Sequence, residues 1–202
     1  LTIESDAASG TAITIKGTSA ANYGVVFNYN NPKQIVATGG GDIEITGSAG
    51  ANYGLFLSNT DVLAAAGTIK LDAGTRGLRV LVGDSTIGAL AGSSVTSSAA
   101  NIELISDRFT LDNAFDFNTA GTLSVDSSSA SFSSAISFDT QWGFANSLTG
   151  LTIGHDSNTA GVSLTEAISI AGPIEVHAGN LSVENSLTTT ATGADVLLKG
   201  AG

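Results

Sequence analysis

Two histidines in this sequence could take part in acid-base chemistry, because imidazole gains and loses a proton near neutral pH. His155 is followed directly by Asp156, and His177 is the second histidine. A hydrolase combines such a histidine with a carboxylate and a nucleophile. No Gly-x-Ser-x-Gly nucleophile motif accompanies either histidine, and both lie in turn-like or alternating strand segments. We therefore expect no catalytic residue and no enzymatic activity.

Carboxylates are the second group that could do chemistry, as calcium ligands. Calcium takes roughly six to eight oxygen ligands, which proteins supply from recognisable loops. Neither an EF-hand loop nor a Gly-Gly-x-Gly-x-Asp repeat is present, and the chain has no Cys to bind a metal through a thiolate. Several aspartates instead lie singly among Ser and Asn: Asp112, Asp116, Asp126 and Asp139. We predict solvated turn carboxylates, with no metal and no cofactor.

Aromatic side chains could bind a carbohydrate by stacking on a sugar ring beside polar groups. Trp142 is the best anchor, with Gln141 and Phe144 close to it in sequence. These three residues are the candidate ligand contacts. The alternative is that Trp142 packs over the core from an inserted loop, and the aromatic density makes residues 130–147 the place where a loop insertion is expected.

A phrase that occurs twice, 30 positions apart, indicates how the chain is organised. The copies run from Ile13 to Phe27 and from Ile43 to Leu57, and repetition on this scale indicates a solenoid. Each copy holds an Asn-Tyr-Gly triplet: Asn22, Tyr23 and Gly24, then Asn52, Tyr53 and Gly54. We expect these triplets to form a corner in which Asn or Gly takes a left-handed turn and each Tyr packs beside its twin.

Short stretches of alternating apolar residues, bounded by Gly, Asn, Asp and Ser, are typical of brief strands between turns. Their first apolar residues recur at a mean interval of about 26 positions, within the range of known repeats. These are Ile13, Ile43, Ile69, Ile102, Leu123, Leu151, Ile174 and Val196. We predict an all-β triangular parallel β-helix with three short strands per turn and about 7–9 turns. Residues Asp61–Ala66 are expected to form a loop or one short helix.

Composition agrees with one elongated unit over residues 1–202, a piece of a longer repeat protein. Charged residues are only 12% of the chain, and the net charge of −11 disfavours nucleic acid and anionic lipid as partners. No apolar run approaches the roughly 20 residues of a membrane-spanning helix.

The segment from Ile168 to Lys199 carries two phrases of the type Gly-x-(Ile/Leu)-x-Val, from Gly172 to Val176 and from Gly179 to Val183. With weaker versions over nearly the whole chain, this pattern resembles the repeat region of filamentous-haemagglutinin-like exoproteins, which are adhesins of bacterial two-partner secretion, and of related autotransporter passengers. The resemblance implies a right-handed parallel β-helix that is secreted and displayed at the bacterial cell surface.

The function that we expect is therefore structural and adhesive: a rigid stalk or display scaffold that contacts a glycan or protein on a host or neighbouring cell. Two alternatives remain open. A polysaccharide-acting β-helix enzyme would need carboxylates clustered on one external face, with a groove and aromatic subsites. A self-assembling extracellular filament subunit would associate end to end or laterally, because the last coils of an uncapped β-helix leave strand edges free.

Overall fold

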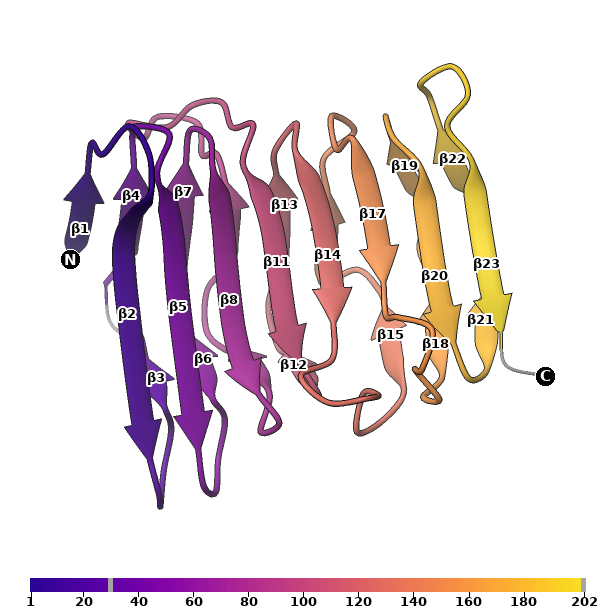
Figure 1. Cartoon of the computed structure of the whole chain (residues 1–202), viewed down its shortest axis with the longest axis horizontal. Coiled ribbons are helices and arrows are strands. Elements are labelled where there is room, and N and C mark those ends of the chain that lie inside the picture. Colours follow the sequence, from indigo (N-terminus) through magenta and orange to yellow (C-terminus); the bar gives the residue numbers. More distant parts are fainter. Residues whose placement is uncertain (29–30, 201–202) are drawn as a thin grey trace.

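The computed structural model describes residues 1–28 and 31–200, and every regular element in this part of the chain is a β-strand. The strands lie side by side along the long axis of the molecule, from the N-terminus at one end to the C-terminus at the other (Figure 1). All the paired strands run parallel, and each partner is the third strand before or after in the sequence. This arrangement of stacked parallel sheets is that of a β-solenoid and agrees with the predicted all-β class.

The longest sheet has eight strands and extends over the whole molecule (Figure 1). In order, it contains β2 (Thr11–Ser19), β5 (Asp42–Ala49), β8 (Thr68–Gly74), β11 (Asn101–Ser106), β14 (Thr122–Asp126), β17 (Gly150–Ile153), β20 (Ile174–Ala178) and β23 (Val196–Gly200).

Four shorter sheets complete the structure. A six-stranded sheet contains β1 (Thr2–Ser5), β4 (Lys33–Ala37), β7 (Thr60–Ala64), β10 (Ser85–Gly88), β13 (Phe115–Asn118) and β16 (Trp142–Phe144), and a separate pair is formed by β19 (Ile168–Ile170) and β22 (Leu187–Thr189). A four-stranded sheet contains β3 (Val25–Val26), β6 (Leu55–Leu57), β9 (Leu78–Val80) and β12 (Phe109–Leu111), and a three-stranded sheet contains β15 (Ile136–Phe138), β18 (Val162–Leu164) and β21 (Leu181–Val183).

The register of the eight-stranded sheet confirms the apolar repeat found in the sequence. Ile13 pairs with Ile43, Ile43 with Ile69, and the same ladder continues without a break to Val196. Successive residues of a strand point to opposite faces. The ladder residues up to Ile174 are therefore buried, while neighbours such as Glu103 face water.

Aromatic residues fill the interior where the four-stranded sheet ends at β12 and the three-stranded sheet begins at β15. The ring centroids of Phe138 and Trp142 are 4.5 Å apart, and those of Phe115 and Phe117 are 4.7 Å apart. Such edge and offset contacts add to the free energy of burial. The large rings occupy space that Val and Ile fill in the other coils.

The repeated Asn-Tyr-Gly corner has the expected tyrosine contact but not the expected backbone. The rings of Tyr23 and Tyr53 stack, with centroids 6.5 Å apart and planes inclined by 9°. None of the corner residues has a positive φ, so the predicted left-handed turn is wrong. The glycines serve close approach instead: a Cβ on Gly24 would lie 2.5 Å from the backbone nitrogen of Ser48, and one on Gly54 would collide with the carbonyl of Ala73.

The loop or helix expected over Asp61–Ala66 is also wrong, because Thr60–Ala64 forms β7. Val62 and Ala64 face the main core, whereas Leu63 faces outward into a second apolar cluster with Val36 and Val95. Parallel pairing on both sides outweighs the helix preference of a short alanine-rich run.

The longest connection in the described chain spans residues 89–100, between β10 and β11, and it supplies Ala89 and Val95 to this second cluster. Residues 130–147, where a loop insertion is expected, contain β15 and β16.

Within the described residues, the structure holds no helix with the length and hydropathy that a membrane crossing requires.

Candidate functional site

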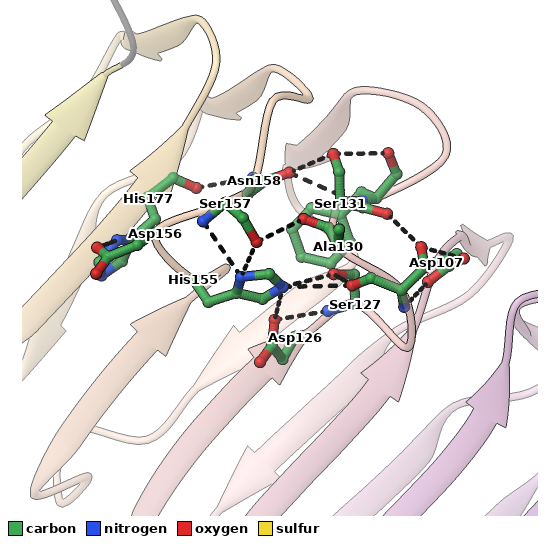
Figure 2. A network of polar contacts seen from close by, with 12 residues as sticks. Asp107, Asp126, Ser127, Ala130, Ser131, His155, Asp156, Ser157, Asn158 and His177 are labelled. Atoms are coloured by element: carbon green, nitrogen blue, oxygen red, sulfur yellow. Dashed lines mark hydrogen bonds and ion pairs between the residues drawn. The ribbon is translucent and has the colours of Figure 1, made fainter.

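A dense polar network joins the loop after β14 (residues 127–135) to the loop after β17 (residues 154–161), as Figure 2 shows. The two loops start at equivalent positions because Val125 pairs with Ile153 in the eight-stranded sheet. Ser, Asn and Asp in such turns bond readily to nearby backbone groups. Stacking of the coils therefore brings together polar side chains that lie about 28 positions apart in the sequence.

His155 is at the centre of this network (Figure 2). Its Nε2 lies 3.1 Å from Ser127 Oγ and 3.5 Å from Asp126 Oδ1. Its Nδ1 lies 2.9 Å from the Oγ of Ser157, which is exposed. The order Ser157, His155, Asp126 is that of nucleophile, base and acid in a hydrolase.

The other hydrogen bonds of the network do not fit that chemistry. The Ser157 hydroxyl has the carbonyl of Ala130 as an acceptor at 3.0 Å, and the Ser127 hydroxyl donates to the carbonyl of Ser129 over 2.6 Å. Acyl transfer also needs free N–H groups beside the nucleophile to stabilise an oxyanion. The N–H groups of residues 157–160 already point at His155 Nδ1, His155 O, Ser131 Oγ and Asn158 Oδ1 respectively. The network therefore holds the two loops together.

Asn158 is the buried centre of the loop contact, with 4% of its surface exposed. Its Nδ2 donates to the carbonyl of His177 over 2.8 Å, and its Oδ1 accepts from Ser131 Oγ at 2.9 Å and from the N–H of Ala160 at 3.1 Å. One amide thus links the loop after β14, the loop after β17 and strand β20. A buried polar group that loses its partner costs free energy, so this amide contributes to holding the three segments together.

Asp107 anchors the first loop to the preceding coil (Figure 2). Its carboxylate accepts from the N–H of Ser129 at 2.8 Å and from Ser129 Oγ at 2.7 Å. Its backbone carbonyl accepts from the N–H of Ser133 at 2.8 Å. Hydrogen bonds to an ionised group are stronger than those between neutral groups.

His177 forms a second charged cluster beside this network. Its Nε2 lies 2.8 Å from Glu175 Oε1, and its Nδ1 lies 2.9 Å from Asp156 Oδ1. The geometry of the Nδ1 contact does not meet the criteria for a hydrogen bond. Lys199 Nζ reaches the same two carboxylates, at 3.1 Å from Glu175 and 3.4 Å from Asp156.

These contacts change the acidity of the exposed groups. The Lys199 hydrogen bond, aided by His177, lowers the pKa of Asp156 and of Glu175. The Glu175 carboxylate in turn raises the pKa of Lys199.

The cluster borders a shallow depression of about 150 Å³. In the described part of the chain, no three His, Asp or Glu side chains are arranged to hold a metal ion.

The aspartates considered as calcium ligands lie in separate surroundings. Asp112 binds Arg79 with an Oδ2–Nη2 distance of 2.9 Å. Asp126 faces His155, and Asp139 accepts from the N–H of Gln141 at 3.1 Å.

Asp116 lines a groove, which has a volume of about 450 Å³ and runs over the outer face of the six-stranded sheet. Thr86, Asp116 and Gly143 are paired neighbours on β10, β13 and β16 along its floor, and residues 89–91 also line it. Burial, with the negative charge of Asp84 as a second cause, raises the pKa of Asp116. A Cβ on Gly143 would collide with the Asp116 carboxylate, so glycine keeps that group accessible.

The predicted sugar anchor lies inside the molecule. Trp142 is 6% exposed, and its indole is packed among Phe117, Phe138 and Phe144. Most of its ring is therefore taken up by the core, although Trp142 also lines a pocket of about 180 Å³ with Asp139 and Phe109, so ligand contact there stays a prediction. Gln141 and Phe144 are half-buried, and ligand contact there stays a prediction.

Comparison of the chain with family models, curated proteins and solved structures gives no match. The resemblance to filamentous-haemagglutinin-like repeats therefore rests on the sequence phrases alone and stays a prediction.

Sequence reasoning missed Asp107, Ser131 and Asn158 as members of the network. One signal was available. The interval from Leu123 to Leu151 equals that from Ala130 to position 158, so the serine-rich run after residue 126 had to stack on the segment around Asn158. The directions of the side chains in those loops needed the tertiary structure.

Proposed function

We propose that this chain is a structural and adhesive segment of a large secreted bacterial surface protein, in which it acts as a rigid stalk or display scaffold. The observation that carries the proposal is the ladder from Ile13 to Val196, which passes through every strand of the eight-stranded sheet without a break. A continuous parallel ladder resists bending because each coil is bonded to the next along the axis.

The finer architecture belongs to the same proposal. The coil is a right-handed β-helix with three strands per turn and about 7–9 turns. Strands in a sheet are about 4.8 Å apart, so seven intervals give a rod roughly 34 Å long. The pairing of every strand with the third strand along supports three strands per turn.

A scaffold explains the polar groups better than a polysaccharide hydrolase does. A glycosidase acts with two carboxylates that flank the scissile bond. Phe117 and Phe144 line the groove, but of its lining residues only Asp116 is acidic, so the second carboxylate is missing there. The hydrogen-bond donors around His155 likewise join the loop after β14 to the loop after β17. The partner that fits the proposal is a glycan or protein on a host or neighbouring cell.

Two measurements test this function on the full chain. Small-angle X-ray scattering should give the elongated profile of a rod. Beads coated with the protein should adhere to cell surfaces more than beads coated with heat-unfolded protein. A compact scattering profile, or release of reducing sugar from polysaccharides by the purified protein, would contradict the proposal.

A second candidate is assembly into filaments, in which copies of the chain contact one another through exposed apolar side chains. On β23, Val196, Leu197 and Leu198 are exposed by 40%, 45% and 42% respectively. Exposed apolar side chains on a strand can pack against another copy. Sedimentation at rising concentration tests this, with Leu198→Lys expected to prevent any association and Val82→Lys, at an exposed site distant in sequence, expected to leave it unchanged.

A further inference from the structure

Two of the three arginines of the chain lie over the ring of one tyrosine on the outside of the four-stranded sheet, and the third is in the turn beside them. The Cζ atoms of Arg108 and Arg79 lie 4.5 Å and 5.7 Å from the centroid of the Tyr53 ring. Arg76 is exposed in the turn before β9, and its carbonyl accepts from Arg108 Nη2 at 3.0 Å. With the stacked Tyr23, these residues form what we call the Arg-Tyr patch: Tyr23, Tyr53, Arg76, Arg79 and Arg108.

The stacking of coils builds this patch. Phe56, Arg79 and Thr110 are paired neighbours on β6, β9 and β12, on the face opposite the buried core residues. The Tyr53 hydroxyl donates to Thr110 Oγ1 over 3.2 Å, which holds its ring across the sheet. Tyr23 meets Phe56 edge-on at a centroid distance of 5.2 Å. The rings thus lie on a rigid surface, so little entropy remains to be lost on binding.

The patch carries positive charge that the rest of the described chain does not neutralise. Arg79 is paired with Asp112, with its Nε 3.0 Å from Oδ2. Neither Arg76 nor Arg108 forms an ion pair with a described carboxylate, and the Nε of Arg108 is buried without an acceptor. The Arg108 guanidinium over the Tyr53 ring and the exposed Arg76 side chain in the adjacent turn therefore carry positive charge that no described carboxylate pairs with, on a chain whose net charge is −11.

We propose that the Arg-Tyr patch binds a glycan through a sugar that carries an isolated carboxylate. Aromatic rings stack on the C–H face of a sugar, and a guanidinium group binds a carboxylate with two parallel hydrogen bonds. This inference rests on the proposed adhesive function and names the ligand class and the site.

The overall charge of the chain decides between kinds of anion. A net charge of −11 repels dense polyanions such as nucleic acid. At physiological salt, charges more than about 8 Å apart are largely screened from each other, so a single carboxylate at the patch responds mainly to the nearby arginines. A sugar with one acidic group therefore fits the patch better than a heavily charged polymer.

The proposal is tested by titrating the protein with 3′-sialyllactose and, separately, with lactose while its NMR spectrum is recorded. The two probes differ by one carboxylated sugar. We expect 3′-sialyllactose to shift the amide signals of β6, β9 and β12, and lactose to bind at least about tenfold more weakly. Arg76→Gln should weaken binding several-fold, and Arg108→Lys, which keeps the charge but removes the planar fork, should do the same. Lys70→Gln is the matched control, since it removes one charge from the eight-stranded sheet.

Four results would overturn the proposal: no binding of 3′-sialyllactose, equal binding of lactose, equal weakening by Lys70→Gln, or binding of a heparin tetrasaccharide or an oligothymidylate in preference to 3′-sialyllactose. Tyr53→Phe and Tyr53→Leu add a check on the ring, because the first keeps the stacking surface and the second removes it. Scattering from the same samples separates the two ideas, since a rod that does not bind contradicts only the patch, whereas a compact particle contradicts the stalk.

Discussion

His177 and Glu175 face each other on β20, with 2.8 Å between Nε2 and Oε1. Lys199 lies opposite His177 in the paired strand β23 and binds the same Glu175 carboxylate. Asp156, from the loop after β17, completes the cluster. Three successive coils are therefore linked by charge at the edge of the eight-stranded sheet.

Stability at this edge should depend on pH on both sides of neutrality. The pKa values of Asp156 and Glu175 lie below their ordinary values of 3.8 and 4.5, so their contribution is present above those values and is lost as the pH falls through the lowered pKa. The pKa of Lys199 lies above 10.5, so its contribution is present below that value and is lost as the pH rises through the raised pKa.

The measurement is the Tm difference between the native chain and Lys199→Met. It should be largest between about pH 5 and pH 10 and should vanish in strong acid. A difference that does not change with pH would show that Lys199 acts through packing rather than through charge.

The contribution of Asp116 to stability should change with pH in the opposite direction to that of Asp156 and Glu175. Burial raises its pKa, so ionisation above the raised value costs stability that is recovered in acid. We expect Asp116→Asn to raise the Tm at pH 7 by roughly 1–3 °C and to leave it unchanged near pH 3. Asp6→Asn, at an exposed position, makes the same change in charge and should have no effect. A lower Tm for Asp116→Asn at pH 7 would mean that the carboxylate has a stabilising partner.

Close backbone approach at the tyrosine corner should make Gly54 intolerant of a side chain. A Cβ there would collide with the carbonyl of Ala73 and lie 2.5 Å from that of Gly47. Gly54→Ala should lower the free energy of unfolding by about 1–3 kcal/mol, measured by urea titration. Gly150→Ala is the control, because its Cβ would meet Thr122 Cγ2 at an ordinary 3.4 Å. Equal losses in the two variants would contradict the packing account.

Trp142 provides a fluorescent probe of the aromatic core. Because the indole is buried among Phe side chains, its emission should lie at short wavelength, resist quenching by iodide and shift to the red on unfolding. Trp142→Ala should cost about 3–5 kcal/mol of unfolding free energy. Neutral or acidic oligosaccharides should leave the emission unchanged. Quenching by a sugar would instead restore Trp142 as a ligand contact.

Asn158 should matter more to the loops than its exposed neighbours do. Asn158→Ala leaves the His177 carbonyl without its side-chain donor, at a cost of about 1–3 kcal/mol. Ser128→Ala, in the facing loop but exposed, should cost little. Limited proteolysis should then cut the loop at residues 127–135 faster in the first variant alone. Equal cleavage would show that the network does not hold this loop.

The repeated features of this fold could be predicted from the sequence. The ladder from Ile13 to Val196 was readable because each coil must present an apolar residue at the same place, which leaves a period in the chain. The contact between Tyr23 and Tyr53 follows in the same way, since equivalent positions of successive coils lie side by side. Parallel stacking converts a period in sequence into proximity in space.

The non-repeated features were decided only by the tertiary structure. Asp61–Ala66 looks helical by composition, but Thr60–Ala64 forms a strand because its neighbours on both sides offer parallel pairing. Trp142 looks like an exposed anchor, yet it is buried where β12 and β15 fail to pair.

The contacts of Asn158 and the arrangement of arginines around Tyr53 depend on loop lengths and side-chain directions that differ from one coil to the next. Position within a period determines which residues are neighbours, but three-dimensional packing determines which of their atoms meet. The stacked scaffold was therefore predictable from the amino-acid sequence, whereas its polar networks and surface sites required the folded chain.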